Sequence, residues 1–327
     1  LYGDNFYFIK RHLTAIILGA IIFNILKNLN INFIEKFSSI SMVFITTTLF
    51  LVLTYGIVVG GSRRWIDLGI VNFQPSELAK PLIILWVAKQ ISNDITQDTD
   101  LKKFVRSIFL PLLCAFLVLL EPDYGTFASI CFILFSQIFF SKIKIIYPSL
   151  TIFASILPLY FVATSSEYRL SRIETWLSRK CDLGIDLLGD CFQLNQSRIA
   201  ISSGGLFGLG PGTSRARWGS LPNSYSDFIS SIIGEEYGFF GLFLLVLAFF
   251  ILISTTFLIA IREKNEIKKL ISVGFGSWIF FQTVINLGGA VGIVPITGIV
   301  LPFVSYGSSA MISIFIALGI MYSRDYE

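Results

Sequence analysis

The sequence predicts an all-α protein that crosses a membrane many times. Hydrophobic residues make up 54% of the 327 residues and charged residues only 14%, whereas soluble domains carry about 25% charged residues. The apolar residues are gathered into runs of roughly the 17 to 25 residues that a helix needs to cross a bilayer. The net charge of +4 is small and its basic residues fall in short clusters between these runs, which argues against nucleic-acid binding.

Nine apolar runs are candidates for transmembrane helices, and together they favour a single integral membrane domain over residues 1–327. The two runs that flank Glu121-Pro122-Asp123 are short for a full crossing, which predicts helices that tilt or meet in a polar cavity. The runs cover approximately Leu13–Leu29, Ile40–Gly60, Pro75–Ile91, Ser107–Leu120, Thr126–Phe140, Ile145–Ala163, Ile229–Ile261, Leu270–Gly289 and Leu301–Tyr322.

Basic residues in the short connections predict the orientation of the chain. They cluster in alternate connections, which the positive-inside rule assigns to the cytoplasm. The long polar loop 164–228 then faces outward, while Arg63 and Arg64 depart from the rule. A chain with nine spans that starts outside, and begins with Leu1 rather than Met, also predicts a preceding helix in the whole protein. The cytoplasmic clusters are Lys27 and Lys36; Lys102, Lys103 and Arg106; Lys142 and Lys144; and Arg262, Lys264, Lys268 and Lys269.

The polar, glycine-rich stretch from Gln193 to Gly241 is where chemistry is expected. His12 is the only histidine and has no cysteine pair at metal spacing, which argues against a zinc site and a Ser-His-Asp triad. The run GLFGLGPGTS lacks the Gly-Lys-Ser/Thr of a phosphate-binding loop. Acid–base chemistry must therefore come from carboxylates, with Lys or Arg to stabilise negative charge.

Asp227 is the first carboxylate candidate, since it lies just before an apolar run. Asp also commonly caps helices, so a purely structural role is the alternative. Glu235 and Glu236 lie inside the run, where an ionisable group usually faces a cavity or a partner. They favour a polar, water-accessible site near Asp227.

A second cluster combines Arg63, Arg64, Glu77 and Lys80. Gln74-Pro75-Ser76-Glu77 is typical of a helix start. Lys80 is placed to pair with Glu77 on that helix, and such a pair within a span also marks a polar pathway. The two arginines suit lipid phosphate or the pyrophosphate of a substrate.

Two further segments interrupt the apolar runs. Asp123, in Glu121-Pro122-Asp123-Tyr124-Gly125-Thr126, either lines a cavity or caps a tight turn. Gly and Pro are dense in Gly292–Gly298 and Leu301–Gly307, which predicts a re-entrant or broken segment, with close packing by small residues as the alternative.

The four cysteines divide into two apolar and two polar positions. Cys114 and Cys131 lie in apolar runs and are expected to pack there. Cys181 and Cys191 lie in the polar loop, where they form a disulfide if the loop faces an oxidising compartment or remain two free thiols otherwise.

Several ordered motifs carry a family resemblance over nearly the whole chain. They are FYFIKRHL, RRWIDLGIVNFQPSELAK, EPDYGT, FQLNQSRIAISSGGLFGLGPGTS, LPNSYSDFISSIIGEEYGFFG, QTVINLGGAVGIVPITGIVLPFVSYGSS and the terminal RDYE. With these blocks in family order, the chain resembles the SEDS (shape, elongation, division, sporulation) family of bacterial cell-wall polymerases, and most of all its cell-division members.

The resemblance implies a fold, an activity and partners. It implies ten helices, the first of them preceding Leu1, with a large extracytoplasmic loop between the seventh and eighth. The implied enzyme is a peptidoglycan glycosyltransferase of the bacterial cytoplasmic membrane, which polymerises lipid II at the outer face with a class B penicillin-binding protein transpeptidase and other division proteins. The family's essential aspartate falls on Asp227.

Three departures from the family pattern lie close to Asp227 and in the last motif. Tyr225 and Ser226 stand where the family usually has His-Thr, and Asn223 where it has Glu. Ser308 replaces the second Gly of Tyr-Gly-Gly-Ser-Ser. These changes bear on local geometry, while Asp227 itself is retained.

The expected mechanism is a one-step inverting transfer with Asp227 as general base. Positive charge for the leaving pyrophosphate is expected from Arg63, Arg64, Lys80, Arg198, Arg215 and Arg217, and a polar cavity from Glu77, Asp123 and Gln193. No cofactor is evidently required, although a divalent cation is a candidate for sharing the pyrophosphate charge. The alternatives are a lipid II flippase, an elongation-type polymerase, and a non-enzymatic scaffold.

Overall fold

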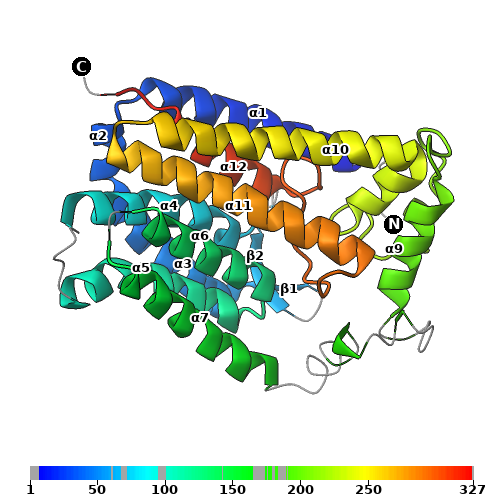
Figure 1. Ribbon diagram of the computed structural model, residues 1–327, viewed down its shortest axis with the longest axis horizontal. Helices are drawn as coiled ribbons and strands as arrows, with labels where there is room; N and C mark the ends of the chain where they lie inside the picture. Colours follow the sequence, from blue (N-terminus) through cyan, green and yellow to red (C-terminus); the bar gives the residue numbers. More distant parts are fainter. Residues whose placement is uncertain are drawn as a thin grey trace. The chain divides into compact units, whose positions relative to one another are not determined.

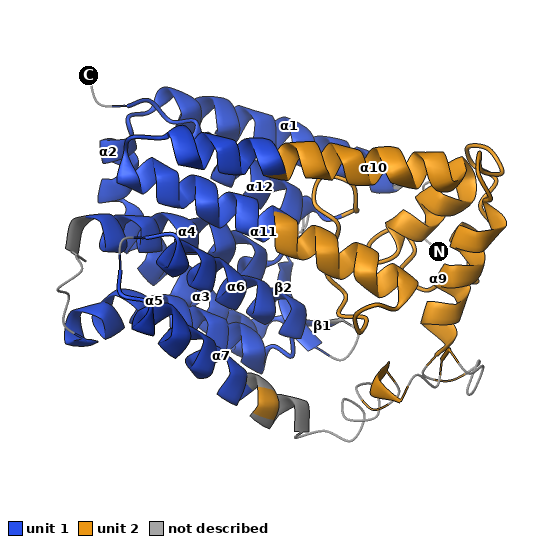
Figure 2. Ribbon diagram, viewed as in Figure 1, with its two compact units in different colours: residues 1–158, 254–279, 307–327 blue, residues 159–253, 280–306 orange. Residues whose placement is uncertain are grey.

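The computed structural model describes residues 7–59, 62–67, 72–94, 101–141, 143–164, 174, 176–178, 181–182, 189 and 191–325, and these are mainly helical (Figure 1). They fall into two compact units (Figure 2). The first comprises Leu1–Pro158, Ser254–Ile279 and Gly307–Glu327, and the second comprises Leu159–Ile253 and Phe280–Tyr306. The prediction of a single membrane domain stays a prediction.

The first unit is built of helices around α4. Pro75 begins α4, as the Gln-Pro-Ser-Glu sequence predicted, because Pro fits the first helical turn and the following Glu complements the helix dipole. The helices are α1 (Tyr7–Asn28), α2 (Ile31–Lys36), α3 (Ser38–Tyr55), α4 (Pro75–Asp94), α5 (Leu101–Leu120), α6 (Tyr124–Phe139), the greater part of α7 (Ile146–Thr164) and α12 (Ser308–Met321).

Helices α1 and α12, from opposite ends of the chain, pack side by side in this unit (Figure 1). Glycine makes the close approach possible, since a Cβ on Gly319 would lie 2.8 Å from Cβ of Leu26. Small residues at helix contacts are the usual means of tight packing in membranes.

A small antiparallel sheet of order β1-β2-β3 also belongs to the first unit. Its strands are β1 (Ile57–Val59), β2 (Ser62–Asp67) and β3 (Asn72–Phe73), with Val58 opposite Arg63 and Ile66 opposite Phe73. The predicted span Ile40–Gly60 is therefore too long, because α3 ends at Tyr55 and a strand follows.

Among the described residues, five helices are long and apolar enough to cross a membrane: α1, α3, α5, α10 (Ile229–Arg262) and α11 (Glu266–Val291). Shorter apolar helices are α6, α12 and the Ile146–Pro158 part of α7. The last predicted span starts too early. Residues 292–307 are non-helical and α12 begins only at Ser308, which confirms the broken segment predicted from its Gly and Pro content.

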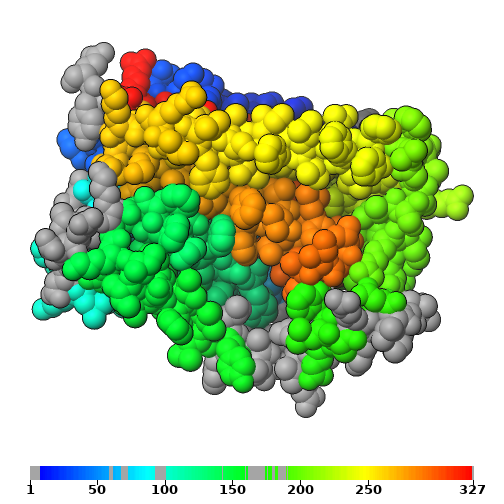
Figure 3. All heavy atoms as spheres, viewed as in Figure 1, coloured from blue at the N-terminus to red at the C-terminus, as the bar shows by residue number. Residues whose placement is uncertain are grey.

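Helices α10 and α11 differ in burial. Only 11% of the apolar window of α10 is buried, against 72% for α11. The side chains of α10 form a continuous yellow strip on the face in Figure 3. An apolar helix that exposes this much surface is suited to contact lipid, whereas α11 packs against other helices.

The second unit contains helix α9 (Phe192–Ser203), the short 3-10 helix η1 (Ala216–Trp218), the N-terminal part of α10, the C-terminal part of α11 and the non-helical segment up to Tyr306. The sequence did not predict α9, which lies within the polar loop. The core of this unit is formed by Ala200, Ala216, Leu221, Phe228, Ile232 and Ala290.

Candidate active site

Asp227 lies two residues before α10 and lines a cavity in the second unit. The carboxylate of Asp227 lies close to the non-helical segment after α11, since a Cβ on Gly298 would be 3.7 Å from its Oδ2. The absence of a side chain at residue 298 therefore leaves room beside the carboxylate. The cavity is lined by Asp227, Phe228, Ile285, Asn286, Gly289, Ala290, Ile296, Thr297, Gly298 and Ile299.

The backbone on which Asp227 sits is held through three consecutive carbonyls. The carbonyl of Tyr225 accepts a hydrogen bond from the backbone N–H of Tyr306 (3.0 Å). That of Ser226 accepts one from the Ser305 hydroxyl (2.5 Å). The carbonyl of Asp227 itself accepts one from the side-chain amide of Asn286 (2.9 Å).

A tight turn completes this support. Asn223 has a φ of 54°, in the left-handed region that Asn tolerates better than most residues. Its carbonyl accepts hydrogen bonds from the backbone N–H groups of Ser226, Asp227 and Phe228 at 3.1 to 3.4 Å. Asn223 and Tyr225, two of the departures from the family pattern, thus have defined roles in the turn, the latter also through an edge-to-face contact with Tyr306.

Glu235 and Glu236 organise the neighbouring loop. The buried carboxylate of Glu235 accepts hydrogen bonds from the Ser214 hydroxyl (2.6 Å) and from the backbone N–H groups of Arg215 (3.0 Å) and Ala216 (3.2 Å). Glu236 lies 3.8 Å from the guanidinium of Arg217. Of the two possibilities for these residues, cavity or partner, the structure shows partners.

Helix α10 is broken at Gly238, which has φ 65° and ψ −160°. The glycine-rich loop satisfies the backbone groups that the break frees. The N–H groups of Phe239 and Phe240 donate to the carbonyls of residues 205 and 206, and the carbonyls of residues 235 and 236 accept from the N–H groups of residues 209 and 210. Backbone groups freed inside a membrane helix need such partners.

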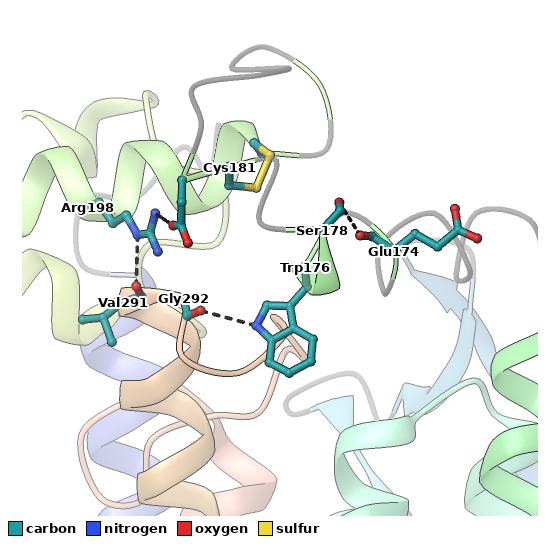
Figure 4. Close-up of a disulfide and its surroundings, with 9 residues drawn as sticks. Glu174, Trp176, Ser178, Cys181, Arg198, Val291 and Gly292 are labelled. Carbon is teal, nitrogen blue, oxygen red and sulfur yellow. Dashed lines mark hydrogen bonds and ion pairs between the residues drawn. A yellow bond between two sulfur atoms is a disulfide. The ribbon is translucent and has the colours of Figure 1, made fainter.

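Arg198 and Gln193 lie on α9. The guanidinium of Arg198 donates to the carbonyl of Val291 (3.0 Å) and pairs with Asp182 (2.7 Å), as Figure 4 shows. Asp182 follows Cys181, which forms a disulfide with Cys191, the first of the two alternatives for these cysteines. Arg198 therefore links the disulfide-bearing loop to the end of α11, while Gln193 is half-buried in the first turn of α9.

The predicted ion pair between Glu77 and Lys80 is confirmed in the first unit. Lys80 Nζ lies 2.8 Å from both carboxylate oxygens of Glu77, and Lys80 is fully buried. The ammonium also lies 4.8 Å from the ring centroid of Trp278, a distance suited to a cation–π contact.

Asp123 is the cap of α6, as the structural alternative predicted. Its carboxylate accepts from the backbone N–H (3.2 Å) and the hydroxyl (3.0 Å) of Thr126, and from the side chain of Gln74 (3.3 Å). Arg64 donates to the carbonyls of Glu121 (3.2 Å) and Pro122.

The predicted site residues thus fall into two groups, each described within its own unit. Arg63, Arg64, Glu77, Lys80 and Asp123 belong to the first unit, and Gln193, Arg198, Arg215 and Asp227 to the second. Their roles toward a substrate stay predictions. In the part of the chain that the structure describes, no group of three His, Cys, Asp or Glu side chains is arranged to hold a metal ion.

Sequence reasoning missed Asn286 and Ser305. The signal for Asn286 was an amide side chain inside the apolar run of α11, where Gln282 is another, because a polar group in such a run needs a partner. Ser305 sits among Gly and Pro residues, where its hydroxyl gave no separate signal.

Comparisons with known proteins agree with this fold. Over residues 1–327 the chain matches the FtsW/RodA/SpoVE family, described as "Cell cycle protein". It is 32% identical to the "Probable peptidoglycan glycosyltransferase FtsW" of Wigglesworthia glossinidia brevipalpis, covering 100% of this chain and 86% of the relative. The protein of the same name from Haemophilus influenzae is 34% identical, with 100% and 83% covered.

Solved structures give the same result. One, described as "Structural coordination of polymerization and crosslinking by a peptidoglycan synthase complex", contains a chain with a TM-score of 0.78 and 26% identity, covering 97% of this chain and 89% of that one. The rod shape determining protein RodA of Thermus thermophilus gives a TM-score of 0.70 and 26% identity, with 98% and 87% covered. The match along the whole sequence and the shared helical fold show that this integral membrane protein belongs to the FtsW/RodA/SpoVE family.

Proposed function

We propose that the protein is a peptidoglycan glycosyltransferase that polymerises lipid II into glycan strands for the septal wall of a dividing cell. The observation that carries the proposal is the placement of Asp227, a carboxylate that lines a cavity and whose own carbonyl and the two before it are all hydrogen-bonded. Such a rigid support is what a general base requires. The names of the relatives supply the reaction class.

The chemistry follows from a lipid-linked donor. A sugar hydroxyl of the acceptor attacks the anomeric carbon of the donor, the carbon–oxygen bond to pyrophosphate breaks, and Asp227 takes the hydroxyl proton. The leaving group departs as undecaprenyl pyrophosphate, and the configuration at the carbon inverts. The bond broken supplies the free energy.

The cations proposed for the pyrophosphate differ in availability. The side chain of Arg215 is exposed, and its backbone is fixed by Glu235. Arg63, Arg64, Arg198 and Lys80 already hold internal partners. Arg215 is thus the candidate for direct contact with phosphate oxygens, which a guanidinium suits, while the other cations are proposed to contribute positive charge. A divalent cation remains a candidate for sharing the same charge.

The proposal places the protein in the bacterial cytoplasmic membrane with loop 164–228 outside, on the strength of the basic connections. It also gives the enzyme a transpeptidase partner, a class B penicillin-binding protein, together with other division proteins. The similarity to a chain of a peptidoglycan synthase complex supports a partnered enzyme.

The test is polymerisation of labelled lipid II by the purified full-length protein with its transpeptidase partner. Wild type is expected to make glycan chains on a gel and Asp227→Asn none, while both fold equally well. Asp325→Asn, at the ion pair with Lys268 in the first unit, is the control and should polymerise normally. Chains from Asp227→Asn would refute the assignment of the base.

The same preparation separates the alternative functions. Lipid II translocation by a protein that makes no chains, with loss in Lys80→Met or Asp123→Asn but not in Asp227→Asn, would favour a flippase. Rescue of elongation rather than division in depleted cells would favour an elongation-type polymerase.

A further inference from the structure

Asn286 lies on α11 and its side chain is 4% exposed. One nitrogen, Nδ2, donates to two backbone carbonyls, that of Asp227 (2.9 Å) and that of Ile299 (2.7 Å). These carbonyls belong to two segments that both line the cavity. A single amide therefore ties both walls together beside the carboxylate.

The orientation of this amide is fixed by its partners. An amide nitrogen has two N–H donors, and both are used here. A flipped amide would place Oδ1 against two carbonyl oxygens, with no donor for either of them. The contact with Asp227 is thus a defined structural element and does not depend on a choice between two equivalent rotamers.

Ser305 acts in the same way on the preceding residue. Its hydroxyl donates to the carbonyl of Ser226 (2.5 Å) and accepts from the backbone N–H of Leu301 (2.8 Å). The side chain of Ser305 is 4% exposed. Donors on α11 and in the segment before α12 thereby fix successive peptide groups of the Asp227 turn.

We propose that Asn286 and Ser305 are positioning residues, which set the direction of the Asp227 carboxylate without touching the reacting atoms. The inference rests on the proposed role of Asp227 as general base. Rotation of the peptide planes at residues 226 and 227 would swing the side chain of Asp227 relative to the acceptor hydroxyl. A displacement of about 1 Å at a reacting group can lower a rate by about 100-fold.

Gln137 provides a matched control in the first unit. Its buried amide also donates from one nitrogen to two backbone carbonyls, those of Ile84 (3.0 Å) and Leu270 (3.0 Å). Asn286→Leu and Gln137→Leu therefore remove the same number and kind of hydrogen bonds, and each should lower Tm. Only Asn286→Leu removes a hydrogen bond from the Asp227 turn.

The experiment measures lipid II polymerisation and backbone amide exchange in wild type, Asp227→Asn, Asn286→Leu and Gln137→Leu. We expect Asn286→Leu to lower kcat by about 10 to 100-fold with KM for lipid II changed by less than about threefold, since substrate contacts remain. Amides of residues 223–228 should exchange faster in Asn286→Leu and as in wild type in Gln137→Leu.

Ser305 gives a smaller second perturbation. Ser305→Ala should show the same pattern to a lesser extent, and Ser305→Thr, which keeps the hydroxyl, should restore activity and slow exchange. This pair keeps the test usable if Asn286→Leu does not fold.

The outcomes distinguish the inference from the function on which it rests. If wild type polymerises and Asp227→Asn does not, yet Asn286→Leu and Ser305→Ala match the Gln137→Leu control, the positioning role is wrong. If wild type makes no chains, the proposed function fails. Unchanged amide exchange at residues 223–228 in Asn286→Leu would then still show that Asn286 does not hold the Asp227 turn.

Discussion

The carboxylate of Glu235, in the apolar helix α10, accepts a hydrogen bond of 2.6 Å from the hydroxyl of Ser214 in the loop between α9 and η1. Two backbone N–H groups bind the same carboxylate. A buried carboxylate with three donors is an anchor for the loop that carries Arg215. The role of Glu235 is therefore structural, which explains why a carboxylate is found inside α10.

Removal of this anchor should loosen the loop. Glu235→Ala leaves a buried hydroxyl and two backbone N–H groups without their acceptor, at a cost of about 1 to 3 kcal/mol for each unsatisfied group. We expect a clearly lower Tm and rapid proteolysis near Arg215 and Arg217. Glu235→Gln keeps one acceptor oxygen and should be milder, so equal Tm values for the two variants would contradict the anchor.

Gly208 and Gly212, in the glycine-rich loop between α9 and η1, should differ in how well they tolerate a side chain. A Cβ on Gly208 (φ 82°) would collide with the carbonyl of Glu236 and approach Cα of Tyr237 to 2.6 Å. Gly212 (φ 79°) has a similar backbone, but a Cβ there meets nothing within 4 Å. Gly208→Ala should therefore destabilise the protein well beyond the roughly 1 kcal/mol of strain expected for Gly212→Ala. Thermal unfolding in detergent measures both losses. A larger loss of Tm for Gly212→Ala would contradict the close packing of Gly208 against α10.

Reduction of the disulfide should lower stability. Cys181 and Cys191 are separated by 10 residues, and closing a loop of this size stabilises by about 2 to 3 kcal/mol in the chain-entropy treatment. Dithiothreitol should lower the Tm of wild type but leave the Cys181→Ser/Cys191→Ser variant unchanged. Cys131→Ala, at a buried free cysteine, is the control that should still respond to reductant.

The buried ion pair of α4 should behave as a coupled unit. Lys80→Met leaves the Glu77 carboxylate buried without its cation, and breaking a buried pair this way costs about 3 to 5 kcal/mol. Glu77→Gln combined with Lys80→Met should be less destabilised than Lys80→Met alone. Additive losses in Tm would show that the two side chains are independent.

Much of the fold could be predicted from the sequence because its causes are local. Apolar runs of bilayer length form the helices, and Gln74-Pro75-Ser76-Glu77 starts α4 as expected. The three-residue spacing of Glu77 and Lys80 brings them together on one helix face. The ordered motifs predicted the family, which the whole-chain match confirms, and through the resemblance they singled out Asp227 as the candidate base.

The tertiary structure alone decided how the Asp227 turn is held and what the nearby charges do. The donors to its carbonyls come from Asn286, Ser305 and Tyr306. The side chains of Asn286 and Ser305 lie 59 and 79 residues along the chain from the residues whose carbonyls they bind. Likewise, the pattern of apolar residues continues through Gly238 although the helix breaks there. Hydropathy and helix propensity act over a few residues, whereas a hydrogen bond between distant segments exists only once packing has brought its donor and acceptor within reach.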